Sequence, residues 1–171
     1  IKDASFTIPK GKVTMIAGPN GSGKTTLFKL IERFYTPESG TIRFGPHDVR
    51  SIQLQEWRQS FAYVLQDPQF FNGTIRDNIN YGMGREVAPE ETESAAKLAC
   101  ADGFIRELPV GYDFVIGENG SRLSAGQRQR IAIARAVMLD PAYLLLDEAT
   151  CNMDIYSEAE VNQALRKLMK N

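Results

Sequence analysis

Residues 13–34 read VTMIAGPNGSGKTTLFKLIERF: an apolar run, a glycine-rich turn and an amphipathic segment. The turn, Gly18-Pro19-Asn20-Gly21-Ser22-Gly23-Lys24-Thr25, has the form GxxxxGK[ST]. Glycines let backbone N–H groups turn inward, and a helix N-terminus adds partial positive charge, so the pattern suits a phosphate. We predict a strand over 13–17, a phosphate-binding loop over 18–25 and a helix from Lys24 to about Phe34.

Two side chains of this loop have distinct expected roles. Lys24 reaches the β- and γ-phosphates, and the Thr25 hydroxyl is a ligand for Mg²⁺. No Asn-Lys-x-Asp motif for guanine is present, which disfavours a GTPase, so the predicted ligand is Mg·ATP. The predicted nucleotide-binding residues of this segment are Gly18, Pro19, Asn20, Gly21, Ser22, Gly23, Lys24, Thr25 and Thr26.

Two further apolar runs end in polar residues. Residues 61–65 run into Gln66, and residues 143–146 run into Asp147 and Glu148. Near-continuous apolar runs are typical of parallel strands buried on both faces, and ligands bind at the carboxyl ends of such strands. The three runs are therefore expected to converge on one site.

The acidic pair at the end of the last run has two interpretations. Asp147 is suited to the Mg²⁺ shell, and Glu148 to orienting or deprotonating an attacking water. The alternative is that the pair only starts a loop or caps a helix. Because successive strand residues point to opposite faces, the two carboxylates are expected to have different roles.

Short strands and helices complete the predicted architecture. Segments 5–8 and 41–44 are predicted to form an antiparallel β layer, and helices are predicted from Pro89 to about Ala101 and over 102–107. The predicted fold is α/β: a mainly parallel sheet flanked by helices in a P-loop NTPase core, with an antiparallel β layer and a helical subdomain. The core and β layer are assigned to 1–66 and 140–171, and the helical subdomain to about 75–138.

A serine-capped helix is predicted after residue 123. Ser124 and Gln127 have the spacing of a capping box, ahead of the apolar positions Ile131, Ala134 and Met138. An ordinary capped helix explains this pattern locally. The functional alternative is a second anion-binding helix N-terminus, with Ser124 and the Gly126 backbone meeting a γ-phosphate.

The composition of the chain narrows the possible classes of function. The 171 residues carry a net charge of −1, so bulk charge gives no reason to expect nucleic-acid binding. Arg128, Arg130 and Arg135 are interpreted as a solvated or ion-paired helix face rather than a basic patch. The two cysteines are expected to be free thiols and His47 a loop residue, and no apolar run is long enough to cross a bilayer.

The order of these motifs resembles the ATP-binding cassette family across essentially the whole chain. This resemblance rests on the phosphate loop, Gln66, residues 123–127 (LSAGQ) and residues 146–150 (LDEAT). Residues 71–79, 108–113 and 115–120 resemble exporter members. The chain is thus similar to the nucleotide-binding domain of a multidrug, lipid or peptide exporter at the cytoplasmic face of a membrane.

The resemblance implies a mechanism of ATP hydrolysis. Two domains would close head-to-tail over two ATP molecules, with Ser124, Gly126 and Gln127 of one covering the γ-phosphate bound by Lys24 of the other. Gln66 would touch Mg²⁺ or the water and report to a transmembrane domain. Glu148 would be the general base; nucleic acid is not an expected partner. The implied catalytic residues are Glu148, Lys24 and Gln66, and the implied Mg²⁺ ligands are Thr25, Gln66 and Asp147.

Some residues depart from the family pattern. Ala125 stands where glycine is usual, and residues 151–154 (CNMD) replace the usual Ser-Ala-Leu-Asp. The adenine-stacking aromatic and the switch histidine are expected outside the chain, so we expect a domain truncated at both ends, with weak nucleotide binding and slow hydrolysis.

Three alternatives compete with the exporter interpretation: a DNA-repair or translation ATPase of the same family, a P-loop kinase or GTPase, and a nucleotide-binding regulator that does not hydrolyse ATP.

Overall fold

The computed structural model describes residues 1–149 and 155–168. Its contacts divide the chain into two compact units, residues 1–61 and 62–171, and each is described by itself. The first unit contains short elements: α1 (Lys24–Ile31), β1 (Arg43–Phe44), β2 (His47–Asp48), a 3₁₀ turn (Val49–Ser51) and α2 (Leu54–Gln59).

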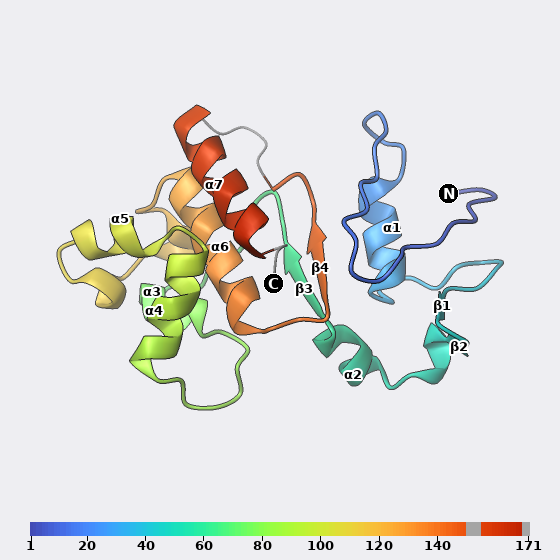
Figure 1. Ribbon diagram of the computed structural model, residues 1–171, viewed down its shortest axis with the longest axis horizontal. Coiled ribbons are helices and arrows are strands. Elements are labelled where there is room, and N and C mark those ends of the chain that lie inside the picture. Colours follow the sequence, from blue (N-terminus) through green and yellow to red (C-terminus); the bar gives the residue numbers. More distant parts are fainter. Residues whose placement is uncertain (150–154, 169–171) are drawn as a thin grey trace. The chain divides into compact units, whose positions relative to one another are not determined.

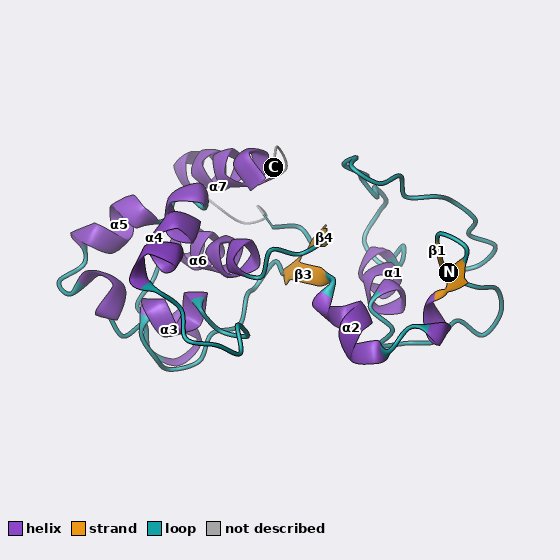
Figure 2. Cartoon of the chain, turned by 60° about the horizontal axis from the view of Figure 1, so that its bottom comes forward, coloured by secondary structure: helices purple, strands orange, loops and turns teal. Residues whose placement is uncertain are grey.

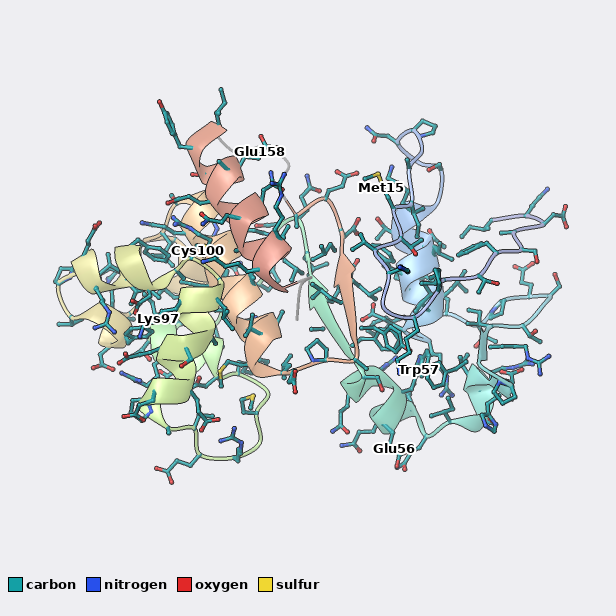
Figure 3. The ribbon with its side chains drawn as sticks, in the orientation of Figure 1. Met15, Glu56, Trp57, Lys97, Cys100 and Glu158 are labelled. Carbon is teal, nitrogen blue, oxygen red and sulfur yellow. The ribbon has the colours of Figure 1, made fainter. Side chains whose placement is uncertain are left out.

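Trp57 is the centre of the first unit. Its side chain is buried, and its indole N–H donates to the Ile31 carbonyl at the end of α1 over 2.7 Å. Figure 3 labels it beside α1. The rings of Phe44 and Phe61 meet it edge-on, with centroids 5.8 and 4.8 Å away, a preferred geometry for aromatic pairs. One aromatic side chain thus joins α1, α2 and the hairpin.

The predicted β layer is present only as a short hairpin. β1 and β2 are antiparallel, with Arg43 opposite Asp48 and Phe44 opposite His47. The prediction that His47 is a loop residue is therefore wrong, and the strand predicted over 41–44 is limited to its last two residues. Segment 5–8 is not a strand.

The strand predicted over 13–17 is also absent. Val13 is 72% and Met15 86% exposed, and the backbone hydrogen bonds described for the first unit give this segment no ladder. A strand needs a neighbour to satisfy its N–H and C=O groups, which an apolar run alone does not supply. The helix that follows ends at Ile31 rather than Phe34, because Arg33 takes a left-handed conformation at φ 60°.

The second unit is mostly helical (Figure 2). Its elements are β3 (Phe61–Val64, whose first residue belongs to the first unit), α3 (Ile75–Ile79), α4 (Pro89–Leu98), α5 (Asp102–Glu107), α6 (Ala125–Met138), β4 (Tyr143–Leu146) and α7 (Ile155–Leu168), with 3₁₀ turns at Gly111–Asp113 and Glu118–Gly120. Strands β3 and β4 form a two-stranded sheet and point the same way in Figure 1.

Helix α6 is the central element of this unit. It packs against α3, α4 and α7, and Figures 1 and 2 show it between them. Ile131 and Ile133 are fully buried, and each such burial contributes about 2–3 kcal/mol. Other fully buried aliphatic side chains are Ile75, Ile79, Ile105, Ile116 and Val161.

Two details of this unit differ from the sequence prediction. Residues of β3 alternate between half-buried and buried, and those of β4 are all half-buried. Burial of both strands on both faces is therefore wrong; the alternation in β3 is typical of a strand with one face on a core. Helix α4 ends at Leu98 rather than Ala101, and Cys100, a free thiol, has a left-handed φ of 55°.

The arginines of α6 do not form a solvated face. Arg130 is 7% exposed and forms an ion pair with Glu160 of α7, with 2.8 Å between Nη1 and Oε2. Arg135 is half-buried and donates to backbone carbonyls. Ion pairing is thus confirmed for Arg130 and solvation is wrong. No described helix is long and apolar enough to span a bilayer.

Candidate functional site

The phosphate loop has the backbone of an anion cradle. Gly21 and Gly23 adopt φ of 79° and 96°, values that L side chains rarely take, and Ser22 N donates to Pro19 O over 3.2 Å. Gly23 is the N-cap of α1, and its position provides no side-chain cap in the described structure. The first N–H groups of α1 therefore lie at a helix end suited to an anion.

Lys24 lies across this loop. Its ammonium donates to the carbonyls of Gly18 at 3.0 Å and Pro19 at 3.2 Å. A flexible stem with a compact charge can exchange carbonyl oxygens for phosphate oxygens, which bind an ammonium more strongly. The loop thus places a cation beside the N-terminus of α1.

Asp147 and Glu148 follow directly after β4. The Asp147 N–H donates to Val64 O over 3.0 Å, and the Tyr63 hydroxyl donates to Asp147 Oδ2 over 3.0 Å. Glu148 has a left-handed φ of 47°, an uncommon conformation for glutamate. Because the strand has already ended, this backbone turn lets the two carboxylates take different directions.

Gln66 lies two residues beyond the end of β3 and is exposed. The residue before it, Leu65, accepts a hydrogen bond from Gln129 of α6 over 3.1 Å. The Gln66 loop is therefore attached to the helix that begins at the 123–127 segment.

The capping box at the start of α6 is confirmed. Gln127 N donates to Ser124 Oγ over 3.2 Å, and Ser124 N donates to Gln127 Oε1 over 2.9 Å. Ser124 and Ala125 are exposed, and the Ser124 hydroxyl keeps its own proton to donate. Gly126 is buried, and a Cβ there would lie 2.6 Å from Ser157 Cβ of α7. Packing alone thus requires glycine at this position.

The predicted site residues are divided between the two units. The 18–26 segment belongs to the first unit, and Gln66, Ser124, Gly126, Gln127, Asp147 and Glu148 belong to the second. Within the second unit, β3 and β4 bring Tyr63 against Asp147, while α6 is bonded to the Gln66 loop. Residues 150–154 of the predicted motifs lie outside the described residues.

Sequence reasoning missed three polar side chains of the second unit. Tyr63 bonds to Asp147, Gln129 to Leu65 O, and Arg135 to Gln69 O. The available signals were a tyrosine inside an apolar strand and polar residues inside an otherwise apolar helix. Burial lowers the pKa of Arg135, with partial opposition from Tyr81, so this cation lies in a poorly hydrated position.

The chemistry of Asp147 can be compared with the ligands that Mg²⁺ uses. The described residues contain no cluster of three or more His, Cys, Asp or Glu side chains. Mg²⁺ typically uses one or two carboxylates together with substrate phosphates and water. Asp147, a carboxylate held by Tyr63 at one oxygen, is of the chemical type that this requirement names.

Comparison with known proteins decides the family. The ABC transporter family model matches residues 1–151. The chain belongs to the ABC transporter family. It is 47% identical over 171 residues to an ATP-dependent lipid A-core flippase of Vibrio cholerae, covering 100% of this chain and 29% of that protein. It is 45% identical over 170 residues to an uncharacterized ABC transporter ATP-binding protein, YfiC, of Bacillus subtilis, covering 99% and 28%.

A plant relative and a solved structure agree with this assignment. ABC transporter B family member 18 of Arabidopsis thaliana is 50% identical over 166 residues, covering 96% of this chain and 14% of that protein. A bacterial Atm1-family ABC exporter with ATP bound matches with a TM-score of 0.80 at 40% identity, covering 88% of this chain and 26% of that one. The ABC family chain thus spans less than a third of each of these relatives, and the structural match confirms the predicted fold class.

Proposed function

We propose that this ABC family chain binds and hydrolyses ATP to power export of a substrate across a membrane. The observation that carries the proposal is the 18–25 loop ahead of α1, with left-handed glycines and Lys24 beside an N-terminus without a side-chain cap. Relatives named as an ATP-dependent lipid A-core flippase and an ABC exporter with ATP bound support the proposal.

Binding of the triphosphate is assigned to the first unit. Backbone N–H groups within 18–26 donate to the phosphate oxygens, and Lys24 neutralises the outer charge. Thr25 and Asp147, with Gln66, would hold Mg²⁺, which neutralises phosphate charge when bound. Tyr63 holds one Asp147 oxygen in place by its hydrogen bond.

Hydrolysis is assigned to Glu148 as general base. Glu148 follows Asp147 with a left-handed backbone rather than a strand conformation, and its carboxylate would orient a water and accept its proton. Gln66 positions that water or the metal. This division separates phosphate binding from proton transfer, whereas a regulator that only binds ATP would need no general base.

The exposed N-terminus of α6 is assigned to a second nucleotide-binding domain. Ser124 can donate its hydroxyl proton, and the amides near Gly126 and Gln127 lie at the positive end of the α6 dipole. In a head-to-tail pair these groups would face the γ-phosphate held by the partner.

The further partner is a transmembrane domain, so this chain would lie at the cytoplasmic face of a membrane. The exposed aromatic side chains of Phe71 and Tyr81 offer that domain an apolar surface.

Nucleotide binding is tested with Lys24→Ala. Loss of charge-assisted hydrogen bonds to phosphate predicts about tenfold to a hundredfold weaker ATP binding by calorimetry. Lys29→Ala is the matched control, since Lys29 lies on the same helix 5.8 Å from the Tyr35 ring centroid. Equal affinity of the Lys24 variant and the unmodified chain contradicts the assignment of the loop.

Hydrolysis is tested with Glu148→Gln, which retains shape and removes the base. ATP is then expected to accumulate in an undissociated dimer, detected by light scattering, with turnover lost. Glu158→Gln is the control, because Glu158 is exposed on α7 (Figure 3). Full turnover in the Glu148 variant rules out the general-base assignment, and stimulation of turnover by DNA favours the repair alternative.

A further inference from the structure

Helix α6 is bonded to both ends of the loop that carries Gln66. The Gln129 side-chain amide donates to Leu65 O over 3.1 Å, and Arg135 Nη1 donates to Gln69 O over 3.1 Å. We call residues 65–69 the glutamine loop. It is therefore fixed to one helix on each side of Gln66.

Gln129 is an unusual residue for its position. Its side chain is 1% exposed, and its Oε1 has no hydrogen-bond partner among the described residues. A buried acceptor without a partner disfavours folding, whereas an apolar side chain of equal volume would not carry that penalty. Stability alone therefore does not explain glutamine here, but its hydrogen bond to Leu65 does.

Arg135 fastens the other end more strongly. Its guanidinium donates to Asn78 O at 2.8 Å and Gln69 O at 3.1 Å. The charge lies 4.9 Å from the Phe70 ring centroid and 5.6 Å from that of Tyr81. No ion pair to Arg135 is found in the described part of the chain. Two carbonyl oxygens and two aromatic rings near the end of the loop, rather than a carboxylate, surround this cation.

Asn78 extends the attachment to residue 71. It is fully buried, accepts from Phe71 N at 3.3 Å and donates to Phe71 O at 3.1 Å. Arg135 Nη2 also donates to Asn78 Oδ1 at 3.3 Å. The downstream end of the glutamine loop is thus held by connected hydrogen bonds around the buried Asn78 side chain, and such networks favour one defined arrangement.

We propose that Gln129 and Arg135 are positioning residues that clamp the glutamine loop to α6, so that Gln66 and the α6 N-terminus move as one body. Gln129 lies about 7 Å along the helix axis from Ser124. The roles of Gln66 and Ser124 at ATP rest on the proposed function. Given those roles, the clamp links the water or metal of one ATP site to the γ-phosphate contact of the other.

The clamp is tested by ¹⁵N relaxation of the whole chain, which needs no nucleotide. The order parameters of the Asp67 and Gln69 amides are expected near 0.8 in the unmodified protein and below about 0.6 in Gln129→Met and Arg135→Lys. Gln129→Met keeps the side-chain volume and removes the unpaired acceptor, so its thermal midpoint should hardly change. Increased loop motion without loss of stability separates positioning from a merely structural role.

Arg130→Lys is the matched control. Arg130 is another arginine of α6 and is buried, but its carbonyl partners are Gly126 and Cys100 rather than the glutamine loop. It should lower the thermal midpoint and leave the order of Asp67 and Gln69 unchanged. Unchanged order in both clamp variants, or equal disorder in the Arg130 variant, overturns the proposal.

A second measurement connects the clamp to turnover. Both clamp variants should reduce kcat at least about fivefold and change KM for ATP less than about twofold, since the phosphate loop is untouched. A rise in KM of about fivefold with constant kcat contradicts the clamp's role at the reacting groups. Absence of hydrolysis in the unmodified protein refutes the proposed function instead, while the relaxation data still decide the clamp.

Discussion

Gly126→Ala tests whether the glycine of the LSAGQ segment is required by packing. A methyl group built on Gly126 would lie 2.6 Å from Ser157 Cβ and 2.7 Å from Ser157 Oγ, so α6 and α7 must separate to admit it. Such overpacking costs about 1–3 kcal/mol, offset by at most about 1 kcal/mol from the higher helix propensity of alanine. We expect net destabilisation of about 1–2 kcal/mol in urea unfolding followed by circular dichroism.

A double-mutant cycle identifies the contact. Ser157→Gly removes both close atoms and leaves Ser157 Cα at 3.6 Å, an ordinary contact. The pair of changes should therefore be more stable than the sum of the single effects by about 1–2 kcal/mol. Gly103→Ala on α5 is the control, because nothing lies within 4 Å of its added methyl. Additive effects, or a Gly126→Ala protein as stable as the original, would refute the packing argument.

Three other substitutions test separate contacts. Burial raises the pKa of the Glu32 carboxyl, partly opposed by Arg58, so the folded protein binds this proton more readily than the unfolded chain. The stability that this group contributes is therefore lost as pH rises through its folded pKa. Glu32→Gln should raise the thermal midpoint at pH 7 and should flatten the change of that midpoint towards pH 4.5. Thr74→Ala removes the α3 capping box, in which Thr74 Oγ1 accepts from Asp77 N at 3.0 Å, and should cost about 1 kcal/mol in denaturant unfolding, whereas Thr74→Ser should not. Glu160→Gln weakens the ion pair to Arg130 and should lower unfolding free energy by about 1 kcal/mol, an effect reduced in high salt; a salt-independent effect contradicts the ion-pair explanation.

Local signals predicted local structure well. Ser124 and Gln127 form the reciprocal bonds that their spacing indicated, and the apolar runs before Gln66 and Asp147 are strands. Caps and short strands with strong propensity depend on neighbours in sequence, which a pattern contains. The α3 cap carried the same kind of signal in Thr74 and Asp77 but was not read as a helix start.

Features that depend on distant residues were not predictable in the same way. The apolar run at 13–17 has strand composition, yet its ladder depends on a partner elsewhere. Arg135 was interpreted as part of a solvated face, because its acceptors at Gln69 and Asn78 lie far away in the sequence. The sequence shows that Arg135 is charged, whereas the carbonyls that accept its hydrogen bonds depend on how α3 and α6 pack. The relation of the phosphate loop to Glu148 stays a prediction.

The connection between 73–75 and 114–116 has a consequence for natural length variation. Ile75 N donates to Phe114 O at 3.0 Å, Ile116 N to Gly73 O at 3.1 Å, and Arg122 N to Ile116 O at 3.2 Å. An inserted residue within 117–123 would break these backbone hydrogen bonds or shift the N-cap of α6. The segment 81–88 is mostly exposed, so extra residues there can bulge into water. Homologues should therefore differ in length between α3 and α4 and keep a constant count ahead of α6.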